Sequence, residues 1–139
     1  MIQDGPGVVD SNLDGVINAS EDLGRQADTY AEQLATQLRK GFLACCVLLI
    51  CGESAKYTSD IILQLRGAEL VVVEGTIYPL LSRLQKDGLL AHEWQESEQG
   101  PPRKYYKLTD FGRDVVARLG GHIKTLNSTL SKLEKGAKS

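Results

Sequence analysis

One short, well-marked helix organises this sequence, and it reads Glu74-Gly75-Thr76-Ile77-Tyr78-Pro79-Leu80-Leu81-Ser82-Arg83-Leu84-Gln85-Lys86-Asp87-Gly88. Its large apolar residues recur at steps of three and four, which places on one face Ile77, Leu80, Leu81 and Leu84. Pro79 lacks an N–H group, so the helix is expected to start near Gly75 or Thr76, with Thr76 as its cap. Gly88 supplies the C-terminal stop. A helix this short does not fold alone, and its apolar face must therefore pack on neighbours.

The opposite face of this helix is narrow and polar. It carries Pro79, Ser82, Arg83 and Lys86. A hydroxyl, a guanidinium and an ammonium group on a strip of this width suit a DNA major groove. The pattern therefore favours a recognition helix that reads DNA with its outer face.

Two further helices are expected before it. From about Ala19 a helical pattern begins, and it strengthens from Leu34 until Gly52 ends the helix. The apolar face predicted to pack consists of Leu34, Leu38, Phe42, Cys45 or Cys46, and Leu49. A second helix covers 58–65, and Gly67 closes it. Its predicted buried residues are Ile61, Ile62 and Leu65. The run 71–73 is too short to be more than a strand stub or an apolar turn. Helix, helix and recognition helix with short connections is the helix-turn-helix order.

A β-hairpin is predicted directly after the recognition helix. Residues 89–96 form the first strand, 97–102 a Gly-Pro-rich turn, and 103–108 a returning strand that alternates basic and aromatic residues. A hairpin in this place is a wing, and Arg103, Lys104 and Lys107 are placed to reach phosphates beside the groove. The alternative is a solvated basic strand that only stabilises the hairpin. The polar strip of the preceding helix favours the DNA interpretation.

Thr109 is expected to cap a last helix that runs to about Lys135. Apolar residues on this helix are spaced three, four, three, four and three apart, as in a coiled-coil seam. They are Val116, Leu119, Ile123, Leu126, Leu130 and Leu133. The simplest way to bury this seam is to pack it against a second copy of the chain, which predicts a homodimer. The alternative is that the helix folds back on its own domain. The pair Gly120-Gly121 predicts a bend or a close backbone approach.

These patterns define the fold class and three segments. The chain is expected to be mainly α with a small β-hairpin, a winged helix-turn-helix with a C-terminal dimerisation helix. Residues 1–33 form an acidic N-terminal arm, mobile in part, residues 34–108 the DNA-binding domain, and residues 109–139 the dimerisation helix.

Composition and charge are compatible with this organisation. The 139 residues have a net charge of −2, but residues 1–33 carry −6 and the remaining residues +4, so the part expected to fold is basic. The longest apolar run, 42–51, is about half the length of a membrane-spanning helix, and no basic signal region opens the chain. We therefore expect a cytoplasmic protein without membrane association. The three cysteines, Cys45, Cys46 and Cys51, suit buried thiols better than disulfides or a zinc site.

One stretch of the acidic arm is similar to a calcium-binding loop. Residues 10–21 place oxygen-bearing side chains at loop positions one, three and five, Gly15 at the sharp turn and Glu21 at the bidentate position. Leu13 stands where a polar residue is usual, and no second loop follows to pair with it. The alternative is an acidic linker with local turns. The sequence leaves both interpretations open, and it predicts no resident metal or cofactor.

Several of these residues together resemble one family. The stretches Glu74-Gly75-Thr76-Ile77-Tyr78-Pro79-Leu80-Leu81 and Gly100-Pro101-Pro102-Arg103-Lys104-Tyr105-Tyr106, with Gly88-Leu89-Leu90 between them, closely resemble the PadR family of transcription regulators. The similarity covers about 34–133 and indicates a short member with a single C-terminal helix. It implies a winged-helix dimer that binds palindromic operators, mostly represses, and is released by small compounds that are often aromatic.

The resemblance also implies site residues. On the recognition helix these are Thr76, Tyr78, Pro79, Ser82, Arg83 and Lys86. On the wing they are Arg103, Lys104 and Tyr105, and Tyr57 joins them at the start of the second helix. Some drug-sensing relatives hold a flat ligand between tryptophans on the last helix. Ile123 occupies that position here, so the expected small-molecule effector would bind in another way.

Two other classes of function compete with a DNA-binding regulator. An enzyme is not supported, because His92 and His122 are the only histidines and neither has a nucleophile or paired carboxylates near it in the predicted elements. A winged-helix module that binds another protein instead of specific DNA is the second alternative. Salt dependence separates the two, since groove binding weakens steeply with salt and an apolar protein contact does not.

Overall fold

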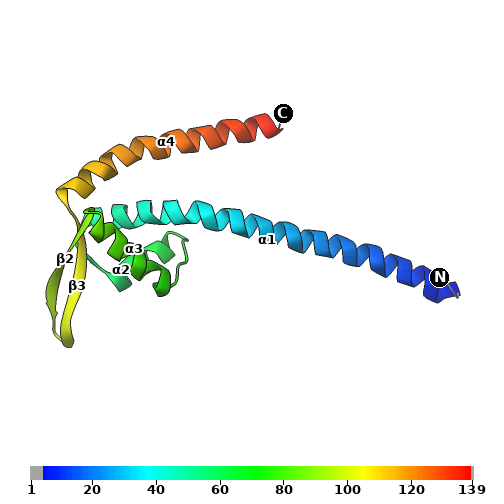
Figure 1. Ribbon diagram of the computed structural model, residues 1–139, viewed down its shortest axis with the longest axis horizontal. Coiled ribbons are helices and arrows are strands. Elements are labelled where there is room, and N and C mark those ends of the chain that lie inside the picture. Colours follow the sequence, from blue (N-terminus) through cyan, green and yellow to red (C-terminus); the bar gives the residue numbers. More distant parts are fainter. Residues whose placement is uncertain (1–4, 139) are drawn as a thin grey trace. The chain divides into compact units, whose positions relative to one another are not determined.

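The computed structural model describes residues 5–138, and the side chains of 18–136. The chain is mainly helical with one small antiparallel sheet, as predicted (Figure 1). In chain order the elements are α1 (Gly5–Glu53), β1 (Lys56–Tyr57), α2 (Thr58–Gly67), α3 (Glu74–Lys86), β2 (Leu90–Ser97), β3 (Gly100–Leu108) and α4 (Asp110–Lys138). The chain forms two compact units, one ending at Gly41 and the other beginning at Phe42.

The first unit is a helical segment of α1 whose described side chains are nearly all exposed. Helix α1 begins at Gly5, well before the expected start near Ala19. The stretch 10–21, considered above as a calcium-binding loop, is helical in backbone instead of looped, and its side chains before Asn18 lie outside the described residues. Exposed ion pairs in this unit join Arg25 to Asp22 and Arg39 to Glu32.

The second unit contains the hydrophobic core. Its buried side chains come from the end of α1, from α2 and α3, and from the sheet; the largest that are fully buried are Val47, Cys51, Ile61, Leu65, Ile77, Leu81 and Leu90. The predicted apolar faces of α2 and α3 are confirmed. Burying an Ile or Leu side chain of this kind contributes about 1.5–3 kcal/mol.

The side of α1 that packs is not the one that the spacing picked out. Leu38, Phe42 and Leu49 are more than half exposed, whereas Leu43 and Val47 lie in the core. Residues 42–51 are apolar all round, so periodicity alone does not distinguish the two faces. By length and composition the segment Asn18–Glu53 could cross a membrane. The most apolar part of this segment, however, includes core residues such as Val47.

The sheet has the strand order β1-β3-β2. Strands β2 and β3 form the predicted wing, with Leu90 opposite Leu108 at its base. Strand β1 was not predicted, because it is only two residues long and is defined by its pairing with Tyr105 and Tyr106 of β3. The turn is shorter than expected, since Gly100 already belongs to β3.

The two prolines, Pro101 and Pro102, therefore lie in a strand and not in the turn. They are tolerated there because β1 pairs only with Tyr105 and Tyr106, which leaves this end of β3 with β2 as its single neighbouring strand. The pairing shifts between Gln95 and Ser97, close to the prolines.

Helix α3 begins earlier and ends where expected. Its N-cap is Val73, and the Thr76 N–H donates to the Val73 carbonyl at 3.0 Å, so the expectation of a Thr76 cap was wrong. At the other end Gly88 has a φ of +84°. The Gly88 N–H donates to the Gln85 carbonyl at 3.0 Å, and the Leu89 N–H to the Leu84 carbonyl at 2.9 Å. This is the pattern of a Schellman motif, which confirms Gly88 as the stop.

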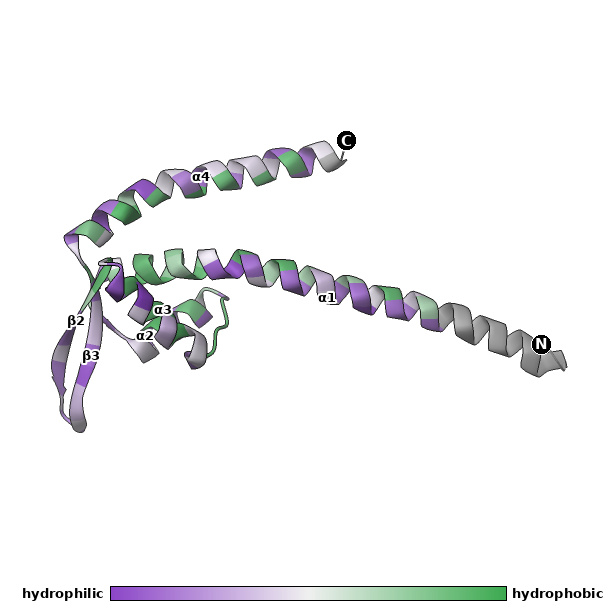
Figure 2. Ribbon diagram, viewed as in Figure 1, coloured by the Kyte–Doolittle hydropathy of each residue, from purple (hydrophilic) through white to green (hydrophobic). Residues whose placement is uncertain are grey.

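Thr109 caps α4 as predicted and also ties it to the end of α3. The Gly112 N–H donates to the Thr109 hydroxyl at 2.9 Å, and that hydroxyl lies 2.6 Å from the Gly88 carbonyl. Helix α4 continues through Gly120-Gly121, with open space around both glycines in the described chain. Figure 2 shows hydrophobic and hydrophilic residues alternating along α4.

Candidate nucleic-acid interface

The outer face of α3 is open to solvent over its whole length. The buried set Ile77, Leu80, Leu81 and Leu84 holds the helix to the core. The six residues predicted for DNA contact on this helix are all exposed: Thr76, Tyr78, Pro79, Ser82, Arg83 and Lys86. Arg83 and Lys86 form no ion pair with another described residue, so both cations are available to an anionic partner.

Aromatic side chains contact two of the three cations of the wing. The guanidinium carbon of Arg103 lies 5.0 Å from the centre of the Tyr57 ring. Tyr57 in turn lies against Tyr105, with ring centres 5.7 Å apart. The Lys104 ammonium lies 5.3 Å from the centre of the Tyr106 ring. Such cation–π contacts restrict a side chain without neutralising its charge.

Lys107 differs from the other two basic residues of the wing. Its ammonium lies 3.7 Å from a carboxylate oxygen of Glu93 on β2. This exposed pair lowers the local positive charge, which makes Lys107 a weaker candidate for a phosphate contact than Arg103 or Lys104.

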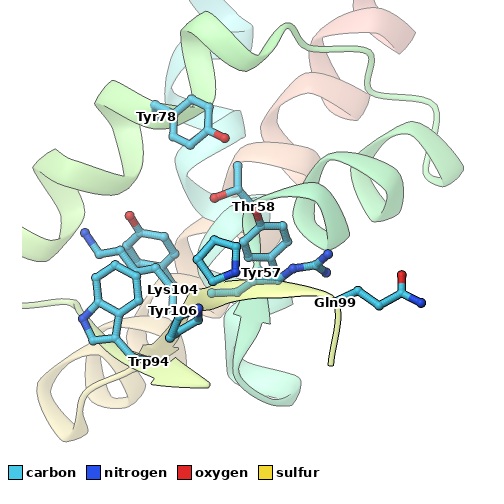
Figure 3. A pocket seen from close by; sticks show the side chains of 10 residues that line it. Tyr57, Thr58, Tyr78, Trp94, Gln99, Lys104 and Tyr106 are labelled. Carbon is cyan, nitrogen blue, oxygen red and sulfur yellow. The ribbon is translucent and has the colours of Figure 1, made fainter. Parts of the chain in front are cut away.

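A groove of about 420 Å³ lies between α3 and the wing (Figure 3). Its lining residues are Tyr57, Thr58, Tyr78, Trp94, Gln99, Pro101, Pro102, Arg103, Lys104 and Tyr106. The structure thus brings together four of the predicted site residues: Tyr57, Tyr78, Arg103 and Lys104. Two cations and no carboxylate line the groove, which suits an anion. The other predicted residues of α3, and Tyr105, do not line it.

The sequence analysis did not assign the other six lining residues to the site: Thr58, Trp94, Gln99, Pro101, Pro102 and Tyr106. One signal could have found two of them. Side chains at positions i and i+2 of a strand share a face, so Tyr106 lies on the same side of β3 as Lys104. Trp94 is the pairing partner of Lys104 across the wing. Thr58 gives no such signal, because its contribution depends on how α2 meets the sheet.

Polar contacts between elements fix the surroundings of the groove. Gln85 of α3 contacts His92 of β2, with 2.8 Å between Nε2 and Nδ1. Near the start of β1, Glu53 accepts a hydrogen bond of 2.9 Å from Gln64 and pairs with Lys56 at 3.3 Å. The hydrogen bond from Gln64, and then that from Lys56, lowers the pKa of Glu53.

The cysteines lie near the core and away from this surface chemistry. Burial raises the pKa of the Cys51 thiol to about 12, and burial followed by the neighbouring Cys45 raises the pKa of Cys46. Both thiols are therefore poor nucleophiles at neutral pH. Within the described residues, no three His, Cys, Asp or Glu side chains gather in a way that could hold a metal ion.

Comparisons with known proteins agree with this arrangement. The model of the PadR-like transcriptional regulator family matches residues 47–118. A PadR-like transcription factor from Bacteroides fragilis is 50% identical with a TM-score of 0.63, and the match covers 73% of this chain and 98% of that chain. A PadR family regulator from Eggerthella lenta is 32% identical with a TM-score of 0.68, over 76% and 93% of the two chains.

A Streptococcus transcriptional regulator is 33% identical with a TM-score of 0.65, over 70% of this chain and 97% of that chain. No curated protein matches the chain. Both the family model and the B. fragilis structure match more than half of the chain, which shows the family. The chain therefore belongs to the PadR family of transcriptional regulators, which regulate transcription by binding DNA and are not enzymes.

Proposed function

We propose that the protein is a cytoplasmic repressor that binds a palindromic operator as a homodimer and is released by a small-molecule effector. One observation carries this proposal: Tyr78 on the exposed face of α3 and the basic wing residues Arg103 and Lys104 line the same groove, and that groove has cations but no carboxylate. A surface of this kind can occupy the major groove and the adjoining backbone at once.

The two parts of the surface would have different roles on DNA. Ser82, Arg83 and Lys86 lie on the exposed face of α3 and would face base edges and nearby phosphates in the major groove. Arg103 and Lys104 would contact the backbone from the wing. Base contacts would select the sequence, and backbone contacts would fix the orientation of the domain.

The dimer proposal rests on the apolar seam of α4. Val116 packs partly against the core, whereas Leu126, Leu130 and Leu133 are 67%, 60% and 66% exposed. A row of exposed leucines at heptad spacing is stabilised when another helix covers it. Two copies joined in this way would place their α3 helices about one DNA turn apart, so half-sites about 10 bp apart are expected.

Regulation would act through the geometry of this pair. An effector that changes the angle between two copies would move one recognition helix out of its groove while the other stays bound. Operator affinity depends on both helices binding at the same time, so a small rotation is enough to release the protein. Repression follows if the operator overlaps the site where transcription begins.

Selection from a random duplex library with the full chain tests the proposal. The expected result is a palindrome whose two half-sites are centred about 10 bp apart. A recovered pool without a shared sequence, or a single asymmetric site, would contradict the palindromic operator. Binding that does not weaken between low and moderate salt would instead indicate a protein-interaction module.

A further inference from the structure

Two largely buried residues at the groove carry hydroxyl groups that have no hydrogen-bond partner within the described part of the chain. Thr58 is only 4% exposed and Tyr106 only 5% exposed, and both line the groove between α3 and the wing. Neither oxygen is sealed from the solvent. A hydroxyl held in a buried side chain and left open on one side is a donor that is ready for a ligand.

The charge of the groove identifies what this ligand carries. Arg103 and Lys104 lie in the lining and form no ion pair with other described residues. Thr58 is the first residue of α2, where the helix dipole favours an anion. Asp60, the carboxylate of the same helix turn, accepts a hydrogen bond from the Tyr57 N–H at 3.1 Å and does not line the groove.

The position of the groove identifies the source of the anion. Tyr78 of α3 lies on one side and the wing residues Trp94 and Lys104 on the other, and Figure 3 shows the Tyr78, Thr58 and Tyr106 hydroxyls around the space between them. With α3 in the DNA major groove and the wing beside it, the DNA strand that runs between them presents its phosphates to this protein groove. The volume of about 420 Å³ leaves room for a phosphate with its adjoining sugars.

We propose that the groove is a seat for one phosphodiester of the DNA backbone in each protomer. The Thr58 and Tyr106 hydroxyls donate hydrogen bonds to the phosphate oxygens, and the Lys104 ammonium supplies the positive charge. This inference rests on the proposed function and adds two contact residues to it. The seat holds α3 and the wing on the same DNA strand, and its contribution to binding does not depend on the DNA sequence.

Removing one oxygen at a time tests the seat. Tyr106→Phe and Thr58→Val keep the shape of each side chain, and neither should unfold the protein, because neither hydroxyl is bonded within the described chain. Tyr30→Phe, on an exposed tyrosine of α1, is the matched control. Fluorescence anisotropy is measured on the selected operator and on a scrambled duplex of the same length. Each groove variant should bind both duplexes about tenfold more weakly than the wild type does, as for a lost hydrogen bond to a charged group.

Neutral methylphosphonates, placed one at a time along the operator, locate the phosphate. For the wild type, replacement of one particular phosphate in each half-site should lower the affinity sharply. For Tyr106→Phe, replacement of the same phosphate should lower the already reduced affinity only a little further. If Tyr106→Phe binds both duplexes as tightly as Tyr30→Phe does, the proposal is overturned. If the wild type bound the selected operator no more tightly than the scrambled duplex, the proposed function would be overturned. The affinities of the groove variants for the scrambled duplex would still test the phosphate seat.

A final arm distinguishes DNA from free phosphate. Trp94 is the only tryptophan and lines the groove, so its fluorescence reports occupancy directly. Duplex DNA should change this fluorescence in the wild type, and inorganic phosphate at the same ionic strength should not. A response to inorganic phosphate, together with unchanged DNA binding by both groove variants, would assign the groove to a free anion and overturn the proposal.

Discussion

Arg83 lies in the last turn of α3 on its exposed face, and a guanidinium in this place can donate two parallel hydrogen bonds to a guanine edge. We predict that Arg83→Ala lowers affinity for the selected operator by about 1–3 kcal/mol and lowers affinity for scrambled DNA much less. Anisotropy titrations on both duplexes measure the two losses. Equal losses on the two duplexes would assign Arg83 to the backbone instead.

Lys104 lies on the wing against the Tyr106 ring and is expected to neutralise a phosphate. Lys104→Ala should weaken binding to every duplex by a similar factor. It should also lower the slope of log affinity against log salt by about one unit, because one fewer counterion is released. An unchanged slope would remove Lys104 from the contact set. Lys107→Ala is the comparison, since its charge is already paired with Glu93.

Gly112 lies where the start of α4 passes the end of α3. A Cβ atom at this position would lie 2.2 Å from the Leu89 carbonyl oxygen, and backbone atoms cannot move aside cheaply. Gly112→Ala should therefore lower the free energy of unfolding by about 1–3 kcal/mol. At Gly75 an added Cβ would meet nothing within 4 Å outside its chain neighbours and the backbone of its own helix, so Gly75→Ala should not destabilise the protein. Urea denaturation compares the two, and a stable Gly112→Ala variant would contradict this contact.

At the scale of the elements, α2 and α3 end in the same motif with different residues. After α2 the left-handed position is Glu69, with a φ of +68°, and the Leu70 N–H donates to the Leu65 carbonyl at 2.8 Å. After α3 that position is Gly88. A side chain in this conformation costs about 1–2 kcal/mol, and glycine avoids the cost.

This difference predicts opposite effects of two substitutions. Glu69→Gly should raise the free energy of unfolding by about 1 kcal/mol, and Gly88→Ala should lower it by a similar amount. Chemical denaturation of both variants beside the wild type gives the two values. Destabilisation by Glu69→Gly would mean that the Glu69 side chain makes a contribution larger than the cost of its backbone conformation.

The sequence predicted those elements whose stability depends on local pattern. The buried faces of α2 and α3, the Gly88 stop, the Thr109 cap and the wing follow from spacing and from single-residue chemistry. Strand β1 could not be predicted, because it exists only through pairing with β3, more than forty residues away. The packed face of α1 was ambiguous for a related reason, since both faces are apolar and the core selects one of them.

The same distinction applies to the candidate site. Exposure of the α3 residues followed from the helical period, and the basic wing followed from its composition. The groove between them depends on how α2, α3 and the sheet meet. Thr58 was missed for this reason. Tyr106 was missed although the strand period places it on the same face of β3 as Lys104; both residues are buried and line the groove.

At the scale of the whole molecule, the exposed leucines of α4 should hold two copies together. We predict that Leu130→Glu places a charge in this seam, gives a monomer in sedimentation velocity experiments, and lowers operator affinity about a hundredfold or more through lost avidity. Ser128→Glu, on the opposite side of the helix by heptad position, should remain a dimer. A dimeric Leu130→Glu variant would place the interface elsewhere.

The number of chains on one operator tests the central proposal most directly. Native mass spectrometry of the full chain with the selected duplex should show two copies bound to one duplex, and one copy on a duplex with a single half-site at much lower affinity. A single chain bound to the full operator, with the same affinity as for the half-site, would contradict the proposal that two α3 helices bind one operator at the same time.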